Sequence, residues 1–437
     1  MTLAVRAVLL IVFYLFLVLT PLLLASLGAG PRRGFVLELA VALGFVGLAV
    51  MGLQFALVAR FRTVAAPFGQ DAVMLFHRQM GYVALALILA HPVLLFLSGF
   101  DPARLLNPVT APWPTRFGLL ALVGLIILVV ISVWRQPLRI SYEVWQFAHG
   151  VLAVLVVSAA LVHIFLTGYY VDQPWKQLFW LAYSLSLIGL LVWVRIVKPI
   201  QLNRRHWRLR RVIPERGQTT TLEIFPEGHP GLVFEPGQFA WLTIGNSPFA
   251  FTRHPFSFSS SAERTEDIQV SIKALGDFTK TVPDLPPGQR VYVDGPFGVF
   301  SPDRWEGPGF VLIGGGIGVT PLMSMLRTFA DREDVRPVYL FLGNPSWEEI
   351  TFREEIEALQ ERMNLTVVHV LSRPHEAWSG ERGRIDIELL GRYLPPQYRR
   401  FRYFVCGPPG LMDAMQTGLP AIGVAEDRIH TERFEFM

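Results

Sequence analysis

Four histidines stand in long apolar runs, where a polar ring is costly and needs a chemical reason. His77 and His91 lie in one run, His149 and His163 lie in another, and the members of each pair are 14 residues apart. On an α-helix, 14 residues advance by about 21 Å and return to within about 40° of the starting direction. Each run would therefore present two imidazoles on one side of a helix, at two depths.

Two equally spaced pairs favour iron ligation. A single membrane histidine is more often a hydrogen-bonding contact between helices, and this remains the alternative. Neutral imidazole binds iron, and a haem within a bundle takes an axial histidine from each of two helices. Pairing by depth predicts a cytoplasmic-side haem between His77 and His149, and an outer haem between His91 and His163.

Small residues and the lack of other ligands support this hypothesis. Gly81 and Gly150 lie near two of the histidines and would leave room for a flat macrocycle. Zinc is disfavoured, because no nearby carboxylate or thiolate completes a set of four ligands. With both axial positions filled, such haems would carry electrons without binding substrate.

The composition divides the chain into a membrane half and a water-soluble half. It has 437 residues, 52% of them hydrophobic, which is too apolar for a wholly soluble protein. Long charge-poor runs are confined to residues 1–200, the predicted transmembrane domain. Six of them are long enough to cross a bilayer, at about 4–27, 35–59, 72–98, 117–134, 146–167 and 176–197.

Charge and cysteine content narrow the location and the partners. Basic residues are more numerous on the side that carries both termini, which favours a multi-pass cell-membrane protein, in the inner membrane if bacterial, with a cytoplasmic C-terminal half. A cleaved signal peptide at the first run is the alternative. The basic cluster Arg195–Arg211 is interpreted as juxtamembrane and not as a nucleic-acid site. A single cysteine, Cys406, excludes a disulfide framework and a thiolate-bound iron–sulfur cluster.

The water-soluble half shows two successive patterns. Short alternating runs over 201–305 predict a small antiparallel barrel, with one strand expected at 256–260. Apolar strands alternate with helices over 306–437 and predict a parallel sheet.

A glycine turn in the second pattern could bind a diphosphate. "GGGIGVTP" follows the apolar run "FVLI", opens a helix, and contains Gly314, Gly315, Gly316, Gly318, Thr320 and Pro321. Glycines allow close approach of the backbone, and a helix start favours an anion. The turn does not match GxGxxG or the P-loop, so by itself it is also compatible with a purely structural turn.

Companion motifs carry a resemblance to a known family. They are "RHPFSFSS" (253–260), "KALGDFT" (273–279), "DGPFG" (294–298) and "CGPPGLM" (406–412), in the order and spacing of the ferredoxin–NADP reductase superfamily. Together with six spans bearing the histidine pairs, they make the chain resemble the NADPH oxidase and ferric reductase family, and in particular compact prokaryotic NADPH oxidases. The resemblance implies an antiparallel Greek-key FAD domain over 201–305 and an α/β NAD(P)H domain over 306–437.

The resemblance also implies residue roles. The residues expected to hold FAD are Arg253, His254, Pro255, Phe256, Ser257, Lys273, Gly276, Phe278 and Thr279, with Ser257 near the flavin N5. The Gly314–Pro321 turn would bind the diphosphate of NADPH, and Cys406, Gly407 and Pro408 would lie beside the nicotinamide. An aromatic near the C-terminus would stack on the flavin, with Phe436 expected and Phe434 the alternative.

Arginine positions bear on the choice between NADPH and NADH. Asn344–Ser346 lacks the arginine that often grips a 2′-phosphate, whereas Arg373 and Arg384 could supply a guanidinium. NADPH is therefore expected, and NADH is the alternative.

These roles imply a transmembrane flavohaem oxidoreductase. A nicotinamide gives up two electrons together and a haem accepts one, so flavin must convert between them. The expected route runs from cytoplasmic NADPH through FAD and two b-type haems to a small-molecule acceptor outside, with dioxygen giving superoxide. The alternatives are a ferric chelate as acceptor, or a periplasmic partner protein to which this chain donates electrons.

Overall fold

The computed structural model describes residues 3–27, 33–59, 61, 64, 67–250 and 253–433. The chain divides into two compact units, Met1–Lys198 and Pro199–Met437. The first unit is helical, and the second contains two six-stranded sheets.

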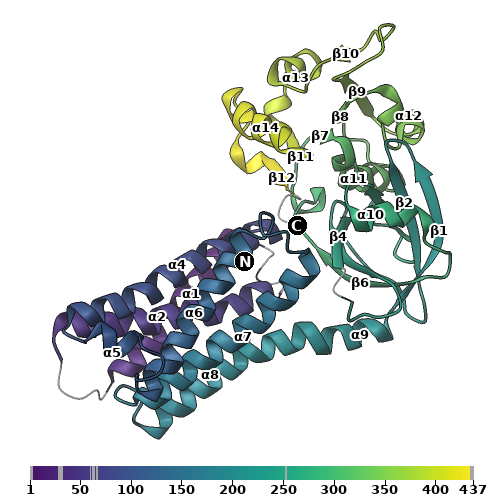
Figure 1. Ribbon diagram of the computed structural model, residues 1–437. Helices are drawn as coiled ribbons and strands as arrows, with labels where there is room; N and C mark the ends of the chain where they lie inside the picture. Colours follow the sequence, from purple (N-terminus) through teal and green to yellow (C-terminus); the bar gives the residue numbers. More distant parts are fainter. Residues whose placement is uncertain are drawn as a thin grey trace. The chain divides into compact units, whose positions relative to one another are not determined.

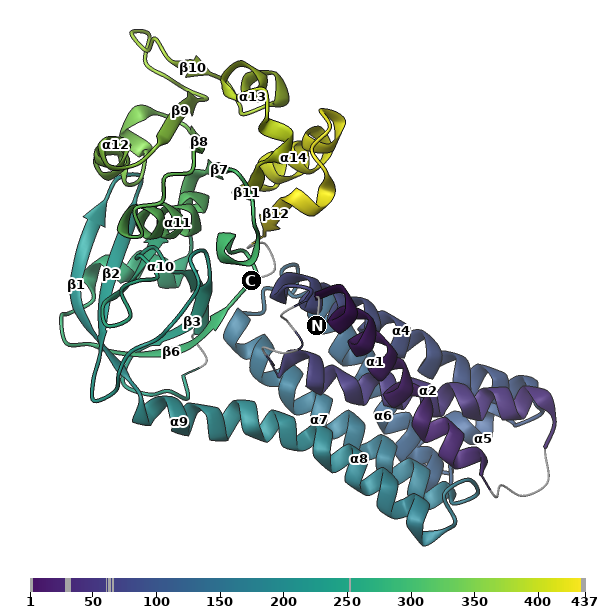
Figure 2. The ribbon, with the colours of Figure 1, turned by 180° about the vertical axis from the view of Figure 1, so that it is seen from behind.

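Within the described part of the first unit, six long helices confirm the six predicted spans (Figures 1 and 2). They are α1 (Leu3–Ser26), α2 (Phe35–Val58), α4 (Gln70–Leu97), α6 (Trp113–Val133), α7 (Tyr142–Thr167) and α8 (Pro174–Val192). A short helix, α5 (Pro102–Leu106), lies between α4 and α6. Each long helix has the length and hydropathy needed to cross a bilayer, so the chain is a multi-pass membrane protein.

Three span boundaries differ from the prediction for local reasons. Helix α7 begins at Tyr142 because the Ser141 hydroxyl accepts a hydrogen bond from the backbone amide of Val144, 3.3 Å away. Helix α6 begins at Trp113 with a proline in its first turn. The last span extends beyond α8 through a π-helical turn, Trp193–Val197, into α9 (Lys198–Arg204).

Glycines allow the helices of the bundle to pack closely. A Cβ atom on Gly47 of α2 would lie 2.7 Å from Ile88 Cγ1 of α4, and one on Gly124 of α6 would lie 2.7 Å from Val156 Cγ2 of α7. Both distances are shorter than van der Waals contact. Small residues at these crossings therefore bring α2 against α4 and α6 against α7, and α4 and α7 carry the histidines.

An antiparallel barrel follows, as predicted. Its strands are β1 (Trp207–Glu215), β2 (Thr219–Pro226), β3 (Phe239–Ile244), β4 (Arg253–Ser257), β5 (Ile268–Lys273) and β6 (Arg290–Phe297), in the order β4-β3-β6-β1-β2-β5. A bridge between Phe258 and Val270 joins the two ends of this order. The strand expected at 256–260 lies earlier, because Arg253–Ser257 pairs with β3.

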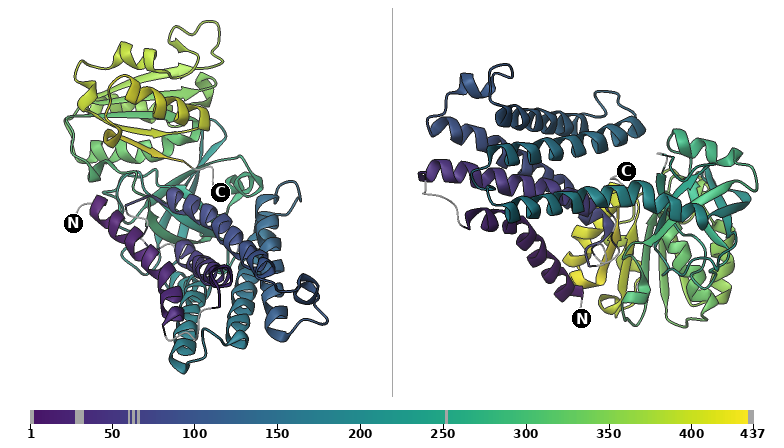
Figure 3. Two further views of the ribbon diagram at one scale, coloured as in Figure 1. Left: turned by 90° about the vertical axis from the view of Figure 1, so that its left-hand side faces the viewer. Right: turned by 90° about the horizontal axis from the view of Figure 1, so that it is seen from below.

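A parallel sheet forms the rest of the second unit and confirms the predicted α/β pattern (Figure 3). Its strands are β7 (Phe310–Gly315), β8 (Val338–Asn344), β9 (Leu365–Leu371), β10 (Glu381–Arg382), β11 (Arg402–Cys406) and β12 (Ile429–Glu432), in the order β10-β9-β8-β7-β11-β12. Helices α11 (Val319–Asp331) and α12 (Arg353–Arg362) share one core with the sheet, and α13 (Ile387–Tyr393) and α14 (Pro409–Ala421) share the core of the opposite face.

The order of these strands locates a binding crevice. The chain first proceeds outward from β7 to β8 and β9, and then returns to place β11 on the other side of β7. In open parallel sheets, ligands bind beyond the carboxyl ends of the strands at such a reversal. The turns after β7 and β11 meet at this point, and both were predicted to bind the nucleotide.

Candidate functional site

The structure brings the four histidines together in the predicted pairs. The ring centroids of His77 and His149 are 6.4 Å apart, and those of His91 and His163 are 6.3 Å apart. A histidine nitrogen lies about 2 Å from a bound transition metal, so two rings ligating one iron from opposite sides have centroids separated by about 6 Å. Both pairs therefore have the spacing that a bis-histidine haem requires.

Hydrogen bonds at Nδ1 orient three of the four rings. His91 Nδ1 is 2.7 Å from the carbonyl oxygen of Ala40, and His163 Nδ1 is 2.8 Å from that of Pro114. A carbonyl accepts only, so in both rings Nδ1 carries the proton and Nε2 is left with a free lone pair. This is the tautomer that ligates a metal through Nε2.

The inner pair is arranged differently. His149 Nδ1 is 3.1 Å from the Ser132 hydroxyl, which also accepts a hydrogen bond from Trp145 Nε1 at 3.2 Å. His77 Nδ1 is buried and has no hydrogen-bond partner within the described part of the chain. One histidine of the inner pair is thus held by a side chain, and the other is held by packing.

Glycines on the neighbouring helices make room for the outer rings. A Cβ atom on Gly44 of α2 would be 3.2 Å from His91 Nδ1, and one on Gly118 of α6 would be 3.0 Å from His163 Nδ1. At Gly81 and Gly150, which were predicted to leave space for the macrocycle, no described residue outside the backbone of the same helix lies within 4 Å of an added Cβ. An apolar cavity contains both outer histidines and reaches Arg33 and Tyr170 at the end of the bundle.

A second feature of the histidine pairs is how few other metal ligands surround them in the described residues. Over the ranges that the structure describes, no group of three or more histidine, cysteine, aspartate or glutamate side chains could hold a metal ion. A zinc or non-haem iron site needs at least three such ligands. The paired histidines therefore fit a group that brings its own equatorial ligands, as a porphyrin does.

The residues expected to hold flavin converge on strand β4 and the turn at α10 (Asp277–Thr281). His254 stacks on Phe278 with ring centroids 4.2 Å apart and an interplanar angle of 18°, and the rings of Phe256 and Phe278 are also nearly parallel. Thr279 Oγ1 accepts hydrogen bonds from the amides of Leu275 and Gly276, at 2.9 and 2.8 Å, and so holds the turn.

Two buried hydroxyls mark the places where ligand groups are expected. Ser257 Oγ at the end of β4 and Thr320 Oγ1 at the start of α11 are buried and have no hydrogen-bond partner among the described residues. Buried hydroxyls are normally paired. Ser257 is the residue expected near flavin N5, and Thr320 belongs to the expected diphosphate turn, so both fit contacts to the two cofactors.

The two glycine turns at the reversal of strand order pack directly against each other. Cys406 of β11 pairs with Gly314 of β7. A Cβ on Gly318 would lie 2.2 Å from the carbonyl oxygen of Cys406, and one on Gly315 would lie 2.7 Å from Pro408 Cδ. Only glycine allows this approach, which places the expected diphosphate turn beside the expected nicotinamide residues.

Burial controls the chemistry of Cys406. The side chain is fully buried, and burial together with the nearby Glu432 carboxylate raises the pKa of the Cys406 thiol. The thiol is therefore protonated at neutral pH and is a poor nucleophile. A packing contact with the nicotinamide suits it better than covalent chemistry.

Two further expected residues lie on β5 and after β9, and the two C-terminal phenylalanines are not among the described residues. Phe434 and Phe436 fall outside the described residues. Lys273 is at the end of β5, and Arg373 is exposed in the loop after β9, where its amide donates to the carbonyl of Pro345 at 2.8 Å.

Sequence reasoning missed the groups that orient the histidines. These are the carbonyl oxygens of Ala40 and Pro114, the hydroxyl of Ser132, and Gly44 and Gly118. Main-chain acceptors carry no side-chain signal, and the glycines lie 45 to 47 residues from the histidines that they accommodate. Only the packing of the helices reveals them.

Comparisons with known families cover most of the chain. Residues 43–160 match the family described as "Ferric reductase like transmembrane component". Residues 218–301 match a family described as "FAD-binding domain", and residues 312–417 match one described as "Oxidoreductase NAD-binding domain".

Individual relatives resemble parts of the chain. The glycine betaine monooxygenase reductase subunit of Pseudomonas aeruginosa is 29% identical over 249 residues, which cover 53% of this chain and 65% of the relative. NADH-cytochrome b5 reductase 2 of Phaeosphaeria nodorum is 35% identical over 161 residues, which cover 35% of this chain and 47% of the relative. The chain thus matches less than two thirds of the length of each of these two relatives.

Among solved structures, the flavohaem-like FAD/NAD binding domain of nitric oxide dioxygenase from Vibrio cholerae is similar, with a TM-score of 0.47 and 23% identity. The match covers 53% of this chain and 98% of that domain.

The three matched families occur in one polypeptide, in the order membrane component, FAD domain and NAD domain. The chain therefore joins a membrane component like that of ferric reductases to FAD-binding and oxidoreductase NAD-binding domains, which is the architecture of the NADPH oxidase and ferric reductase family.

Proposed function

We propose that this protein carries electrons from cytoplasmic NADPH across the cell membrane to dioxygen on the opposite face, giving superoxide. The single observation that carries the proposal is the facing of two histidine pairs, at 6.4 and 6.3 Å, within a bundle joined to FAD- and NAD-binding domains. When bound, FAD takes up a hydride and releases its electrons singly, and each b-type haem carries one electron at a time. NADH is the alternative donor.

The proposed domains are a di-haem membrane domain over 1–200, an FAD domain over 201–305 and an NAD(P)H domain over 306–437. In the first domain, His77 and His149 would hold the inner haem, and His91 and His163 the outer one. Because each iron would have two protein ligands, substrate cannot displace a ligand easily, and the residues there serve electron passage. The cavity around the outer pair reaches Arg33 and Tyr170, which supports an acceptor at that end of the bundle.

In the second and third domains, the chain binds and orients the two nucleotides. Arg253, Lys273 and the turn at Gly276 would hold the FAD phosphates, while the Ser257 hydroxyl would face the flavin ring. The Gly314–Pro321 turn would hold the NADPH diphosphate, with Arg373 reaching the 2′-phosphate. Phe436 would stack on the flavin and exclude water until the nicotinamide displaces it.

A donor role for a protein partner is the second candidate function. The Pseudomonas aeruginosa relative is, by its name, a reductase subunit of a monooxygenase. This favours a reductase that hands electrons to another protein over one that reduces a ferric chelate.

The test uses the purified full-length protein reconstituted with FAD and haem. Low-spin haem absorption with two haems per FAD, reduced on addition of NADPH, is expected. Superoxide formation that is lost in argon and exceeds ferric-citrate reduction supports the oxidase. If the haems are reduced but neither acceptor is consumed, the oxidase proposal is wrong and a protein acceptor replaces it; if no haem binds, the whole route fails.

A further inference from the structure

Helix α11 connects the two cofactor segments of the second unit. It begins at Val319, within the expected diphosphate turn, and Thr320 at its start has a buried hydroxyl that faces no partner among the described residues. On the other side of the connection, the flavin strand β4 ends at Ser257 and continues into a buried segment, Ser259–Ala262. This segment packs on one side of α11.

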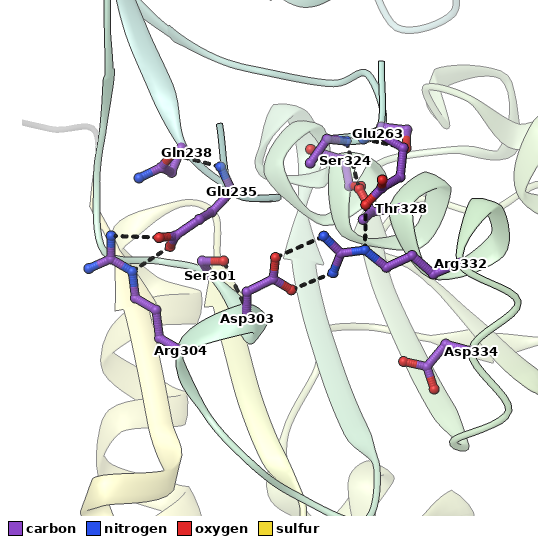
Figure 4. A network of polar contacts seen from close by, with 12 residues as sticks. Glu235, Gln238, Glu263, Ser301, Asp303, Arg304, Ser324, Thr328, Arg332 and Asp334 are labelled. Carbon is purple, nitrogen blue, oxygen red and sulfur yellow. Dashed lines mark hydrogen bonds and ion pairs between the residues drawn. The ribbon is translucent and has the colours of Figure 1, made fainter. Parts of the chain in front are cut away.

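Two buried hydroxyls of α11 bind the main chain of that segment (Figure 4). Ser324 Oγ donates to the carbonyl oxygen of Ser260 at 2.8 Å. Thr328 Oγ1 accepts from the amide of Ala262 at 2.9 Å, and donates to the Ser324 carbonyl at 2.6 Å. Both hydroxyl side chains have no exposed surface. Buried main-chain groups need partners, so these side chains fix the segment against the helix in one register.

Arginines extend the same contact at its edges. Arg327 Nη1 donates to the carbonyl oxygen of Ser259 at 2.7 Å, while its Nε and Nη2 bind the Glu355 carboxylate at 2.7 and 2.6 Å. Arg332 binds Glu263 at 2.6 Å and binds Asp303 through two nitrogens, at 2.7 and 3.0 Å (Figure 4). The four α11 residues Ser324, Arg327, Thr328 and Arg332 are spaced to lie on one side of a helix.

The connection is short at both ends. Ser324 is one helical turn after Thr320, and Ser259 is two residues after Ser257. If the segment shifted along α11, the flavin strand would therefore move relative to the nucleotide turn by almost the same distance. A buried hydroxyl network resists such a shift, because a displaced main-chain group would be left unpaired.

We propose that Ser324 and Thr328 are positioning residues for hydride transfer, an inference that rests on the function proposed above. Neither residue belongs to the strand expected to bind flavin or to the turn expected to bind the nucleotide. They instead hold the flavin strand against the helix that begins in the nucleotide turn. In the step that they serve, a C–H bond of the nicotinamide breaks and an N–H bond forms on the flavin. The hydrogen and both bonding electrons move together, which oxidises the nucleotide and reduces the flavin by two electrons.

Thr328→Val and Ser324→Ala test the proposal in the full-length protein, since each removes a hydroxyl with little change of shape. Anaerobic stopped-flow mixing with NADPH measures flavin reduction. We expect the limiting rate to fall by about tenfold to a hundredfold, the range produced by a small misplacement of reacting atoms. The Kd for NADPH and the FAD content should not change. Faster amide hydrogen exchange over 259–263 is expected as a readout independent of turnover.

Two controls accompany these variants. Thr328→Ser retains the hydroxyl and should restore the rate. Arg392→Gln removes an ion pair with Glu381, at 2.5 Å, that does not involve α11, and should react like the wild type.

The outcomes separate the two proposals. If the wild-type flavin is not reduced by NADPH, the proposed function fails. If the wild type reacts and both hydroxyl variants match its limiting rate, the positioning role is overturned. Loss of FAD from both variants also overturns it, because the hydroxyls would then maintain the fold and not the reaction geometry.

Discussion

At the scale of single residues, the second nitrogen of each membrane histidine decides whether the first can bind iron. Carbonyl oxygens of Ala40 and Pro114 fix the proton of His91 and His163 on Nδ1. These hydrogen bonds would also increase the basicity of Nε2, which would stabilise ferric iron in the proposed haem site. The outer site is thus more tightly specified than the inner one, where His77 Nδ1 has no partner in the described part of the structure.

Replacing His91 tests the assignment of the outer pair. His91→Ala would remove one of the proposed haem ligands, so haem content should fall to about half, while NADPH still reduces the flavin. A pyridine haemochrome assay measures the haem, and anaerobic flavin bleaching measures the reduction. His375→Ala is the matched control, since His375 is exposed in the loop after β9. Full haem content in His91→Ala would rule out this pairing.

The reactivity of the one cysteine reports its surroundings. Burial and the Glu432 carboxylate raise the pKa of the Cys406 thiol, so the reactive thiolate is scarce at pH 8. We expect native protein to resist alkylation by iodoacetamide at this pH, and protein unfolded in guanidinium to react at the rate of a free thiol. Mass spectrometry counts the adducts. Rapid labelling of the native protein at pH 8 would contradict a buried, protonated thiol.

At the scale of elements, close packing of α6 against α7 sets the position of His163, a proposed haem ligand. Gly118→Ala would add a Cβ at 3.0 Å from His163 Nδ1, where the Pro114 carbonyl already lies 2.8 Å from the same atom. The ring must move, so we expect weaker binding of the outer haem and a haem content between one and two per chain. Haem absorption per protein is the measurement.

Gly189→Ala provides the matched control for the glycine variant. Gly189 lies in α8, and among the described residues no atom outside the backbone of that helix is within 4 Å of its added Cβ. This variant should keep the wild-type haem content. Equal haem content in both variants would show that Gly118 does not determine the position of His163.

At the scale of the whole molecule, buried histidines make the second unit sensitive to acid. Burial lowers the pKa of His369 and that of His430 to about 4 from the usual 6.5. Between these two pH values the unfolded chain binds protons that the folded chain does not. The contribution of these two histidines to the stability of the folded state is therefore fully present above about pH 6.5, and it declines as the pH falls toward 4.

Thermal unfolding across this pH window tests the linkage. The melting temperature should fall as the pH is lowered from 6.5 to 4. Circular dichroism in the β-sheet region measures this melting temperature. His430→Phe keeps a ring against Trp305, whose centroid is 4.4 Å from that of His430, and removes one titrating group. This variant should show a shallower decline. A decline as steep as that of the wild type would exclude His430 as a contributor.

The sequence by itself determined the elements and the chemical inventory of this protein. Hydropathy predicted six spans because a helix must present apolar residues over the full thickness of a bilayer. Strand alternation predicted the barrel, strand–helix alternation predicted the parallel sheet, and equal spacing of the histidines predicted their pairing. All these signals are local, or repeat with the period of one element.

Tertiary structure alone decided the contacts between elements distant in sequence. The carbonyls that orient His91 and His163 lie 51 and 49 residues away, and the hydroxyls that bind Ser260 and Ala262 come from a helix more than 60 residues later. Main-chain acceptors leave no mark on residue type, and a buried serine or threonine does not reveal its partner. Such contacts depend on how helices and strands pack, which no single segment of the sequence encodes.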